Sequence, residues 1–240
     1  MYTRFTYERV LGIGGQGRVF AVQDAARGGA RFALKERPAS ATLELKEEFE
    51  LLTRLRHPHI AAVHDWFPIS PIKGEEGEVE RSAYTQDLVA GQDFYTALNS
   101  ASEAQQDEAV AQVFRALAYL HALQVVHLDL KPDNVFVGFV DDVVDAHVLD
   151  FGIAERRGTV TDYVMGSRSY VAPERLRGEP VDPRADLFAI GVMMAEVSSK
   201  QWLSLHNFPR LVDLGERRLY FQSIGVRPAW LETVAALTAF

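Results

Sequence analysis

Cysteine is absent from this sequence of 240 residues, and its absence excludes several kinds of chemistry. The chain can have no disulfide framework, no thiolate zinc site and no cysteine nucleophile, so any metal must be held by oxygen or nitrogen ligands. A chain without cysteine suits a reducing compartment, and a cytoplasmic location is expected.

Basic residues are scarce, and long apolar runs are lacking. The 25 Lys and Arg are outnumbered by 33 Asp and Glu, which gives a net charge of -8. A nucleic-acid partner is not expected, because phosphate binding usually requires a clustered basic surface. No run approaches the roughly 18 apolar residues of a membrane span, and the start MYTRFTYERVLGIGG is too polar for a secretory signal. We therefore expect no membrane segment in this chain.

The remaining composition is that of a folded protein. Hydrophobic residues make up 48% of the chain and charged residues 24%, well away from the disordered regime. The length fits one large domain or two small lobes that share a cleft.

The first third of the chain is rich in β-strand patterns. FTYERVLGIG, GRVFAVQDA and RFALKE predict three antiparallel strands, and apolar residues spaced through 42–55 predict a helix that ends before Pro58. IAAVHDWF and RSAYTQDLV predict two more strands. Between them, PISPIKGEEGEVE is polar, acidic and marked by Gly and Pro, which is typical of a mobile connection.

Helical patterns dominate from Asp93 onward, including the Ala-rich stretch EAQQDEAVAQVFRALAYLHAL. The chain thus divides near Ala90 and Gly91 into a β-rich half and a helical half. The predicted fold class is α+β.

Gly12, Gly14 and Gly17 form a G-x-G-x-x-G pattern between two predicted strands. A dinucleotide-binding fingerprint would require a helix directly after the glycines, whereas a strand pattern follows here. The position favours a hairpin over phosphates, because glycines let the backbone approach a polyanion closely. An ordinary Gly-rich turn is the alternative.

Lys35 lies in the middle of an apolar strand pattern, where an unpaired cation would be costly. The following helix offers four glutamates as partners. They are Glu44, Glu47, Glu48 and Glu50. An exposed lysine with solvated glutamates is the alternative interpretation.

VVHLDLKPDNVFV carries the most specific signal, because it places five functional side chains in eight residues between two apolar runs. Phosphoryl transfer has a use for three of them. A carboxylate can accept the proton of the attacking hydroxyl, a cation can offset charge on the transferring group, and an amide oxygen can ligate magnesium. Asp129, Lys131 and Asn134 fit these tasks in that order.

Asp150 follows an apolar strand pattern in HVLDFGIA. An Asp at a strand end is a suitable ligand for Mg²⁺, which prefers one or two carboxylates together with the phosphates of a nucleotide. A simple turn is the alternative, and the preceding HLDLKPDN makes it less plausible.

The order of these motifs, with Ala172-Pro173-Glu174 after them, resembles the Ser/Thr protein kinase family of the eukaryotic-like type. The resemblance spans Val10 to about Glu196. It implies a bilobal catalytic domain over residues 1–240, with an N-lobe over about 1–89, a hinge at about 87–92 and a C-lobe over about 93–240. A nucleotide is expected where the two halves meet.

The resemblance assigns catalytic roles residue by residue. The three glycines cover ATP, and Lys35 holds its α- and β-phosphates. Counting back from the HPHI turn makes Glu48 the ion-pair partner of this lysine, with Glu47 as the second choice. Asp129 becomes the catalytic base and Lys131 the charge-neutralising partner near the γ-phosphate. Asn134 and Asp150 become ligands of Mg²⁺, for which Mn²⁺ is a possible substitute.

Adenine would be held by apolar side chains and by backbone groups of the hinge. Leu11, Val19 and Ala33 would lie on one side and Phe136 on the other, with backbone groups near Asp87 and Val89 bonding the adenine edge. Plain strand core is the alternative role of these apolar side chains. Lys131, two residues after the base, favours Ser/Thr substrates. Asp186 matches a helix aspartate that supports the catalytic loop.

The sequence departs from the family where the usual H-R-D reads His127-Leu128-Asp129. Without this arginine, a phosphate on the activation loop loses its main partner, so the expected activity does not depend on loop phosphorylation. The loop still offers five hydroxyls as acceptors. They are Thr159, Thr161, Tyr163, Ser167 and Ser169.

A second departure concerns Glu174, whose usual arginine partner lies further along the family's chain. Arg217, Arg218 or Arg227 are candidate substitutes. We expect either a domain cut from a longer protein or a short C-lobe covered by a regulatory partner or a further chain. Four aromatic residues would then form a partly exposed surface, with core packing as the alternative for each. They are Trp202, Phe208, Trp230 and Phe240.

The expected function is transfer of the γ-phosphate of ATP to protein hydroxyls. One alternative is a pseudokinase that binds nucleotide or acts as a scaffold, which the intact set of Lys35, Asp129, Asn134 and Asp150 disfavours. Another is a small-molecule phosphotransferase, which the combined presence of the Gly-rich hairpin and the APE segment disfavours.

Overall fold

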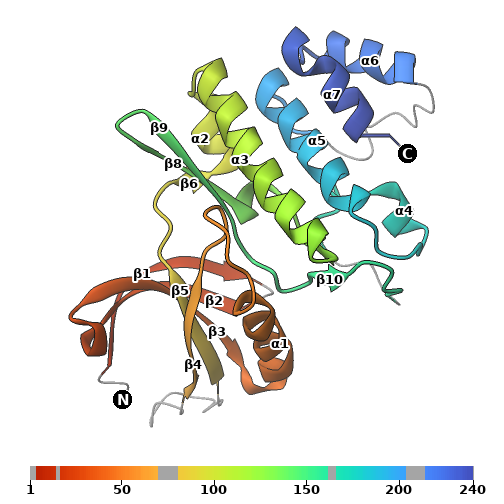
Figure 1. The fold of residues 1–240 in the computed structure, drawn as a ribbon. Helices are drawn as coiled ribbons and strands as arrows, with labels where there is room; N and C mark the ends of the chain where they lie inside the picture. Colours follow the sequence, from red (N-terminus) through yellow and green to blue (C-terminus); the bar gives the residue numbers. More distant parts are fainter. Residues whose placement is uncertain (1–3, 15–16, 70–80, 162–165, 204–213, 240) are drawn as a thin grey trace. The chain divides into compact units, whose positions relative to one another are not determined.

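The computed structural model describes residues 4–14, 17–69, 81–161, 166–203 and 214–239. The chain forms two compact units, Met1–Val89 and Ala90–Phe240. The first is built on a β-sheet and the second is mainly helical (Figure 1), so the fold class is α+β as predicted.

The first unit holds five antiparallel strands in the order β1-β2-β3-β5-β4. They are β1 Phe5–Gly14, β2 Gly17–Asp24, β3 Ala30–Pro38, β4 Val63–Ile69 and β5 Arg81–Asp87. Short 3-10 turns at Ala25–Arg27 and Ala39–Ala41 flank β3. The one helix described in this unit, α1, spans Thr42–Leu52 and buries Leu45, Glu48 and Leu52, which recur at helical spacing.

Two expected boundaries in this unit differ from those observed. The helix ends at Leu52 rather than Leu55, because Thr53 to Leu55 continue as turns whose N–H groups donate to carbonyls of the last helical turn. Strand β4 begins at Val63 rather than Ile60 and includes Pro68 and Ile69 of the predicted connection, the rest of which, 70–80, lies outside the described residues.

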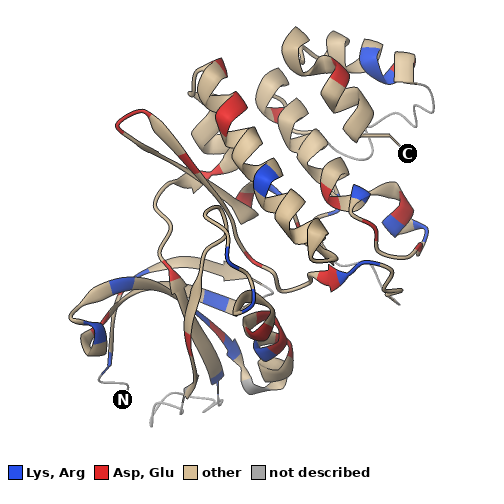
Figure 2. Ribbon diagram, viewed as in Figure 1, with Lys and Arg blue, Asp and Glu red and all other residues tan. Residues whose placement is uncertain are grey.

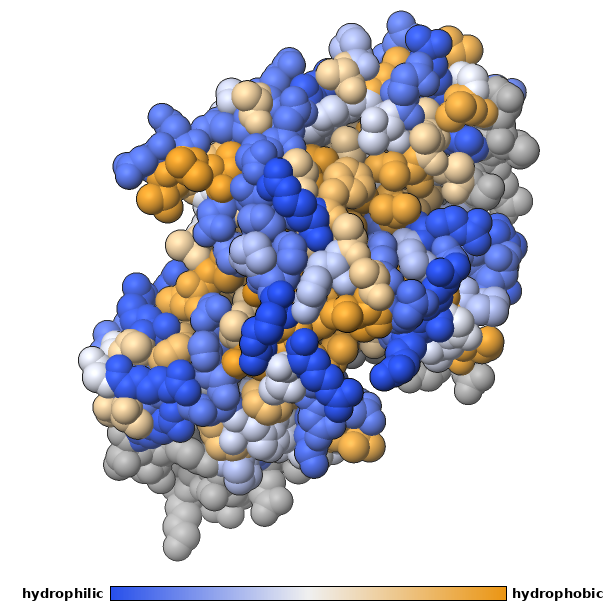
Figure 3. All heavy atoms as spheres, in the orientation of Figure 1, coloured by the Kyte–Doolittle hydropathy of each residue, from blue (hydrophilic) through white to orange (hydrophobic). Residues whose placement is uncertain are grey.

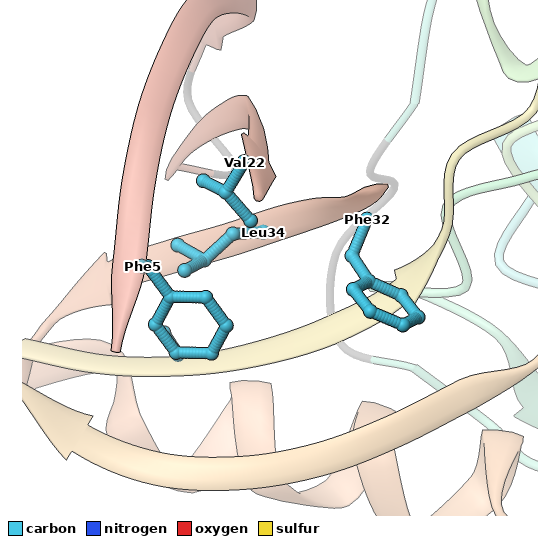
Figure 4. Close-up of a cluster of buried hydrophobic side chains, with 5 residues drawn as sticks. Phe5, Val22, Phe32 and Leu34 are labelled. Carbon is cyan, nitrogen blue, oxygen red and sulfur yellow. The ribbon is translucent and has the colours of Figure 1, made fainter. Parts of the chain in front are cut away.

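The sheet has two apolar faces because side chains alternate along each strand. One face carries a cluster of Phe5, Val22, Phe32, Leu34 and Ala83, with Phe20 and Phe67 packed at its margin. Four members of the cluster are labelled in Figure 4, which shows them between the curled strands. The opposite face carries Lys35 and Tyr84, which are cross-strand partners, and it faces α1.

The second unit combines short strands with six helices among its described residues. Its strands are β6 Gln92–Asp93, β7 Val125–Val126, β8 Val135–Val140, β9 Val143–Val148 and β10 Glu155–Arg156. Its helices are α2 Phe94–Asn99, α3 Glu103–Ala122, α4 Pro173–Leu176, α5 Arg184–Ser199, α6 Leu214–Ser223 and α7 Pro228–Leu237, with a 3-10 turn at Pro132–Asn134.

Helix α3 starts at a capping box, in which Ser102 Oγ accepts from Gln105 N and the Gln105 side chain accepts from Ser102 N. Helix α5 is buried on nearly all sides, which makes it the central element of this unit. Helix α7 packs on α5 so closely that a Cβ at Gly191 would stand 2.9 Å from Leu237 Cβ. None of the described helices is long and apolar enough to cross a membrane.

Candidate active site

The lysine of β3 is buried and paired. Lys35 Nζ donates to both carboxylate oxygens of Glu48, at 2.7 and 2.9 Å, and the Tyr84 hydroxyl donates to Glu48 Oε1 at 2.9 Å. Of the four candidate glutamates, Glu48 is the one on the buried face of α1, whereas Glu47 is exposed. Such a pair holds both side chains in one orientation, because breaking it would leave a buried charge.

The three glycines of the β1–β2 hairpin differ in what the fold requires of them. Gly17 has φ +114°, and a Cβ there would stand 2.3 Å from Glu36 O, so the backbone itself demands glycine. At Gly12 and Gly14 a Cβ would meet no atom within 4 Å. Residues 15 and 16 of the loop lie outside the described residues.

Two of the expected adenine contacts share the face of the sheet that carries Lys35. Val19 is the cross-strand partner of Lys35, and Ala33 lies two residues earlier on β3, so their side chains project from the same face. Leu11 lies in a register shift of β1 and is partly exposed. Phe136 is half-buried on β8 of the second unit.

The end of β5 holds the expected hinge residues. The Asp87 N–H donates to Ala62 O at 2.9 Å, and its carboxylate accepts from Ala62 N and bonds His64 Nε2. Its N–H is thus already used within the first unit. Val89 follows two residues after β5 ends, at the last position of this unit.

The segment HLDLKPDN of the second unit, residues 127–134, is anchored by Asp186 of α5. The two carboxylate oxygens of Asp186 accept from His127 N and Leu128 N, each at 2.9 Å, and His121 Nε2 lies 2.8 Å from Oδ2. Leu128 has φ +65°, a left-handed conformation that costs energy for a branched side chain. The two bonds to Asp186 hold the backbone in this bend, as expected for this aspartate.

Asp129 is buried and surrounded by two side chains of its own loop. Lys131 Nζ lies 3.0 Å from Asp129 Oδ2, and Asn134 Nδ2 donates to the same oxygen at 3.0 Å and to Asp129 O at 2.8 Å. Both partners of the Asn134 amide are acceptors, so its NH₂ group must face Asp129. The amide oxygen of Asn134 therefore points away from Asp129.

The β8–β9 hairpin brings Asn134 and Asp150 to the same end of the sheet. Val135 pairs with Val148, and Leu149 N donates to Asn134 O at 2.8 Å, so the residues just before β8 and just after β9 are neighbours. His127 Nε2 lies 2.9 Å from Leu149 O and must donate to it, because a carbonyl only accepts. The loop that carries Asp129 is thereby joined to the strand end that carries Asp150.

The residues at this end fit a magnesium ion. An amide oxygen and a carboxylate supply hard oxygen ligands, and Mg²⁺ keeps several waters or phosphate oxygens instead of a full protein cage. Asp150 has φ +61°, and its Oδ1 accepts from Gly152 N at 3.3 Å. No group of three acidic or histidine residues suited to a metal occurs among the described residues. Two protein ligands therefore suit an ion that takes its remaining ligands from water or from the phosphates of a nucleotide.

The segment after Asp150 returns to Asp129 and then to α5. A Cβ at Gly166 would lie 3.4 Å from Asp129 Oδ1. Further along, the Tyr170 hydroxyl donates to Glu196 Oε2 at 2.8 Å, and Leu203 N donates to Glu196 Oε1 at 2.8 Å. Burial raises the pKa of Glu196 to about 7, although the two hydrogen bonds oppose this shift.

The three arginines expected as partners of Glu174 make contacts with other residues. Glu174 Oε1 is buried without a hydrogen bond. Arg218 pairs with Glu232, Arg227 pairs with Glu103 and Asp107, and Arg217 Nε donates to Ala235 O at 3.0 Å. Each of the three candidate arginines therefore has a partner other than Glu174.

The aromatic residues of the C-terminal part divide into two groups. Trp230 is buried, with the Arg227 guanidinium 3.9 Å over its ring and its Nε1 donating to Asp107 at 2.6 Å. Trp202 is exposed and stacks on Tyr95 with ring centroids 4.2 Å apart. Phe208 and Phe240 lie outside the described residues, as does Tyr163.

Comparison with known proteins identifies the family. Residues 5–212 match the family model of the protein kinase domain. The chain is 33% identical over 210 residues to the serine/threonine-protein kinase PknA of Mycobacterium tuberculosis, which is 82% of this chain and 47% of that protein. It is 32% identical over 209 residues to the DNA damage-responsive serine/threonine-protein kinase RqkA of Deinococcus radiodurans, 81% of this chain and 30% of that protein.

A third relative gives the same picture. The serine/threonine-protein kinase pkn3 of Myxococcus xanthus is 30% identical over 213 residues, 81% of this chain and 37% of that protein. The chain belongs to the protein kinase domain family. It spans less than half the length of each of these three relatives.

Three contacts around the site escaped the sequence analysis. His121 bonds Asp186, Tyr84 bonds Glu48, and Tyr170 bonds Glu196. Each joins elements far apart in the chain, so no local pattern marks it. Tyr84 lies in β5, whose sequence RSAYTQD is mostly polar, so its hydroxyl does not stand out from its neighbours.

Proposed function

We propose that this domain is an ATP- and magnesium-dependent protein serine/threonine kinase. The observation that carries the proposal is the buried carboxylate of Asp129, held by Lys131 and Asn134 and joined through the hairpin end to Asp150. A domain that only bound nucleotide would be free to lose this carboxylate. Membership of a family whose matched relatives are named serine/threonine kinases supports the substrate class.

In the proposed reaction, Asp129 orients a Ser or Thr hydroxyl of a protein substrate and accepts its proton. The hydroxyl oxygen forms a bond to the γ-phosphorus while the bond from that phosphorus to the β-γ bridging oxygen breaks, and ADP leaves. Lys131 offsets charge on the transferring group. Asn134 and Asp150 would hold magnesium, which when bound neutralises charge on the phosphate oxygens.

The first unit supplies the remaining groups of the proposal. Lys35, oriented by Glu48, binds the α- and β-phosphates, and the hairpin of Gly12, Gly14 and Gly17 covers them. Leu11, Val19, Ala33 and Phe136 contact adenine, and the backbone near Asp87 and Val89 bonds its edge. Because the Asp87 N–H already donates to Ala62 O, only its carbonyl is proposed to take part.

The test is incubation with labelled ATP and Mg²⁺ together with a mixed protein substrate. Asp129→Ala and Asp150→Ala should each lower the rate at least about 100-fold, the lower range for a positioned acid-base or metal group. Glu232→Gln removes an exposed carboxylate of α7 and should leave the rate within about twofold, since surface charges contribute little. Turnover that survives Asp129→Ala, or transfer to sugars but not to proteins, would refute the proposal.

A further inference from the structure

The β8–β9 hairpin ends in exposed apolar side chains that the proposed reaction does not use. Val140 and Val143 are cross-strand partners beside the turn and are 65% and 66% exposed, and Phe139 is 41% exposed. We call these three residues the hairpin patch. Figure 3 shows hydrophobic side chains directly behind the hydrophilic tip of this hairpin. A cluster of this kind is typical of an interaction surface, whereas single exposed apolar residues need no explanation.

The hairpin is held rigidly from its other side. Gln112 of α3 donates to Val144 O at 2.9 Å and accepts from Ala146 N at 2.7 Å. These are outward-facing backbone groups of β9, which forms the edge of its sheet. Gln112 thus occupies the positions that an added strand would need. The hairpin patch can therefore contact a partner through side chains but not by extending the sheet at these positions.

The turn at the tip is made of two acidic residues in a costly conformation. Asp141 and Asp142 have φ values of 49° and 65°, the left-handed region that a two-residue hairpin turn requires. Asn-Gly suits such a turn better, and two adjacent carboxylates also repel each other. Asp suits the first position of such a turn, so it is Asp142 that stands where glycine is preferred.

The charged side chains of residues 135–148 are Asp141, Asp142 and Asp145, and neither Lys nor Arg occurs among these residues. Asp145 is exposed and bonds His147 Nε2 at 2.9 Å. Glu108, one turn before Gln112 on α3, accepts from Gln112 and is paired with Arg115. Figure 2 shows acidic residues at the tip of the hairpin and on the first half of α3. A complementary surface would carry apolar side chains between basic ones.

We propose that the hairpin patch and the carboxylates of Asp141, Asp142 and Asp145 form a docking site for a protein segment whose apolar side chains are flanked by Lys or Arg. The apolar groups of that segment would cover Val140 and Val143, and its cations would meet the three carboxylates. The proposal is independent of the phosphoryl-transfer chemistry, because none of these residues belongs to the proposed active site.

The first experiment measures binding of a fluorescein-labelled peptide of 12 residues, with two leucines flanked by arginines, by anisotropy. Val140→Thr combined with Val143→Thr keeps the side-chain shape and the β-propensity but removes apolar surface, and it should weaken binding at least 10-fold. Asp141→Asn combined with Asp142→Asn should weaken binding severalfold and reduce its dependence on salt. Leu219→Gln, which removes a 67% exposed leucine on α6, is the matched control and should change nothing.

The second experiment removes the dependence on one peptide sequence. A library of displayed random peptides is selected on the wild type and, separately, on the Val140→Thr/Val143→Thr variant. Sequences enriched only on the wild type should combine apolar and basic residues. The same sequences from both selections, or peptides without basic residues from the wild type, would overturn the proposal.

Two other partners of the hairpin patch, a second copy of the chain and a membrane, would each give a different result. Concentration-dependent dimerisation in sedimentation velocity that disappears in the Val140→Thr/Val143→Thr variant would assign the hairpin patch to a second copy of the chain and overturn the proposal. Binding of the wild type but not of this variant to vesicles of mixed neutral and anionic lipids would overturn it in favour of a membrane. Turnover of a short peptide substrate should stay within twofold in both hairpin variants.

Discussion

At the scale of single residues, Lys35 and Glu48 form a buried ion pair. Their side chains are 5% and 1% exposed. Lys35→Met should lower the free energy of unfolding by about 3 to 5 kcal/mol, because it leaves the Glu48 carboxylate buried without its cation. Chemical denaturation measures this loss.

A double variant separates the two causes of that loss. Lys35→Met with Glu48→Gln removes both charges and still lets residue 48 accept from Tyr84, so it should recover more than half of the lost stability. Lys46→Met, which breaks the exposed pair with Glu50 on the same helix, should cost less than about 1 kcal/mol. If the double variant is as unstable as the single one, the cost arises from packing rather than charge.

The glycines of the β1–β2 hairpin provide a second prediction at this scale. Gly17→Ala should destabilise the first unit by about 1 to 3 kcal/mol, because its φ of +114° and the nearby Glu36 O exclude a Cβ. Gly12→Ala meets no atom within 4 Å, so its stability should change by less than about 0.5 kcal/mol. Thermal melts measure both.

The comparison of Gly17→Ala with Gly12→Ala also tests the role of the β1–β2 hairpin. If the hairpin covers ATP phosphates, Gly12→Ala should raise the KM for ATP severalfold while the melt stays unchanged. An unchanged KM would show that this glycine has no part in nucleotide binding. The sequence pattern alone treats the three glycines alike, whereas the structure distinguishes a glycine required by the backbone from one that only a ligand could require.

At the scale of elements, Glu196 couples the segment of Tyr170 to the end of α5. Its pKa is raised from 4.5 to about 7 in the folded chain by burial. Protonated Glu196 is therefore favoured by folding, and this stabilisation is complete below about pH 4.5 and is lost as the pH rises through about 7. Glu196→Gln, which stays neutral and keeps an acceptor for Leu203 N, should remove this pH dependence.

Urea denaturation from pH 5 to pH 8 measures the effect. Relative to the wild type, Glu196→Gln should gain up to about 3 kcal/mol between these limits. Glu232→Gln on α7, which breaks an exposed pair with Arg218, should show no such change. A constant difference between Glu196→Gln and the wild type at every pH would mean that the carboxyl does not titrate in this range.

The helices and strands also show how much of the fold the sequence could predict. Alternating and helical patterns located the strands of the first unit and the helix α3 to within a few residues, because their apolar faces are continuous. The candidate motif residues could be named because they are close together in the sequence, as in Asp129, Lys131 and Asn134. The pairing of Tyr170 with Glu196, 26 positions later, depends on folding of the whole unit and left no local trace.

The hairpin patch marks another limit of the sequence. The apolar run VFVGFVDDVV reads as two strands, but alternation cannot show which of its valines face α3 and which remain exposed. The register of β8 with β9 and the bonds of Gln112 to β9 decide this. The exposed valines of β8 and β9 can be identified only when the position of α3 is known.

At the scale of the whole molecule, each of the two units has its own core. Leu34 and Leu45 are fully buried in the first, and Leu117, Leu120 and Ile190 are buried in the second. Because each core lies within one unit, Lys35→Met should speed hydrogen exchange of amides in residues 4–89 at least 10-fold. Amides of α3 and α5 should change less than threefold. An equal increase throughout the chain would show that the units open together.

Helix α5 contacts three other parts of its unit at three points along its length. Asp186 in its first turn supports the bend at Leu128, Glu196 near its other end supports Tyr170, and Gly191 between them seats α7 without room for a methyl group. A small rotation of α5 would therefore shift Leu128, Tyr170 and α7 together. A bulky side chain at position 191, remote from any reacting atom, would thus displace both the bend at Leu128 and the side chain of Tyr170.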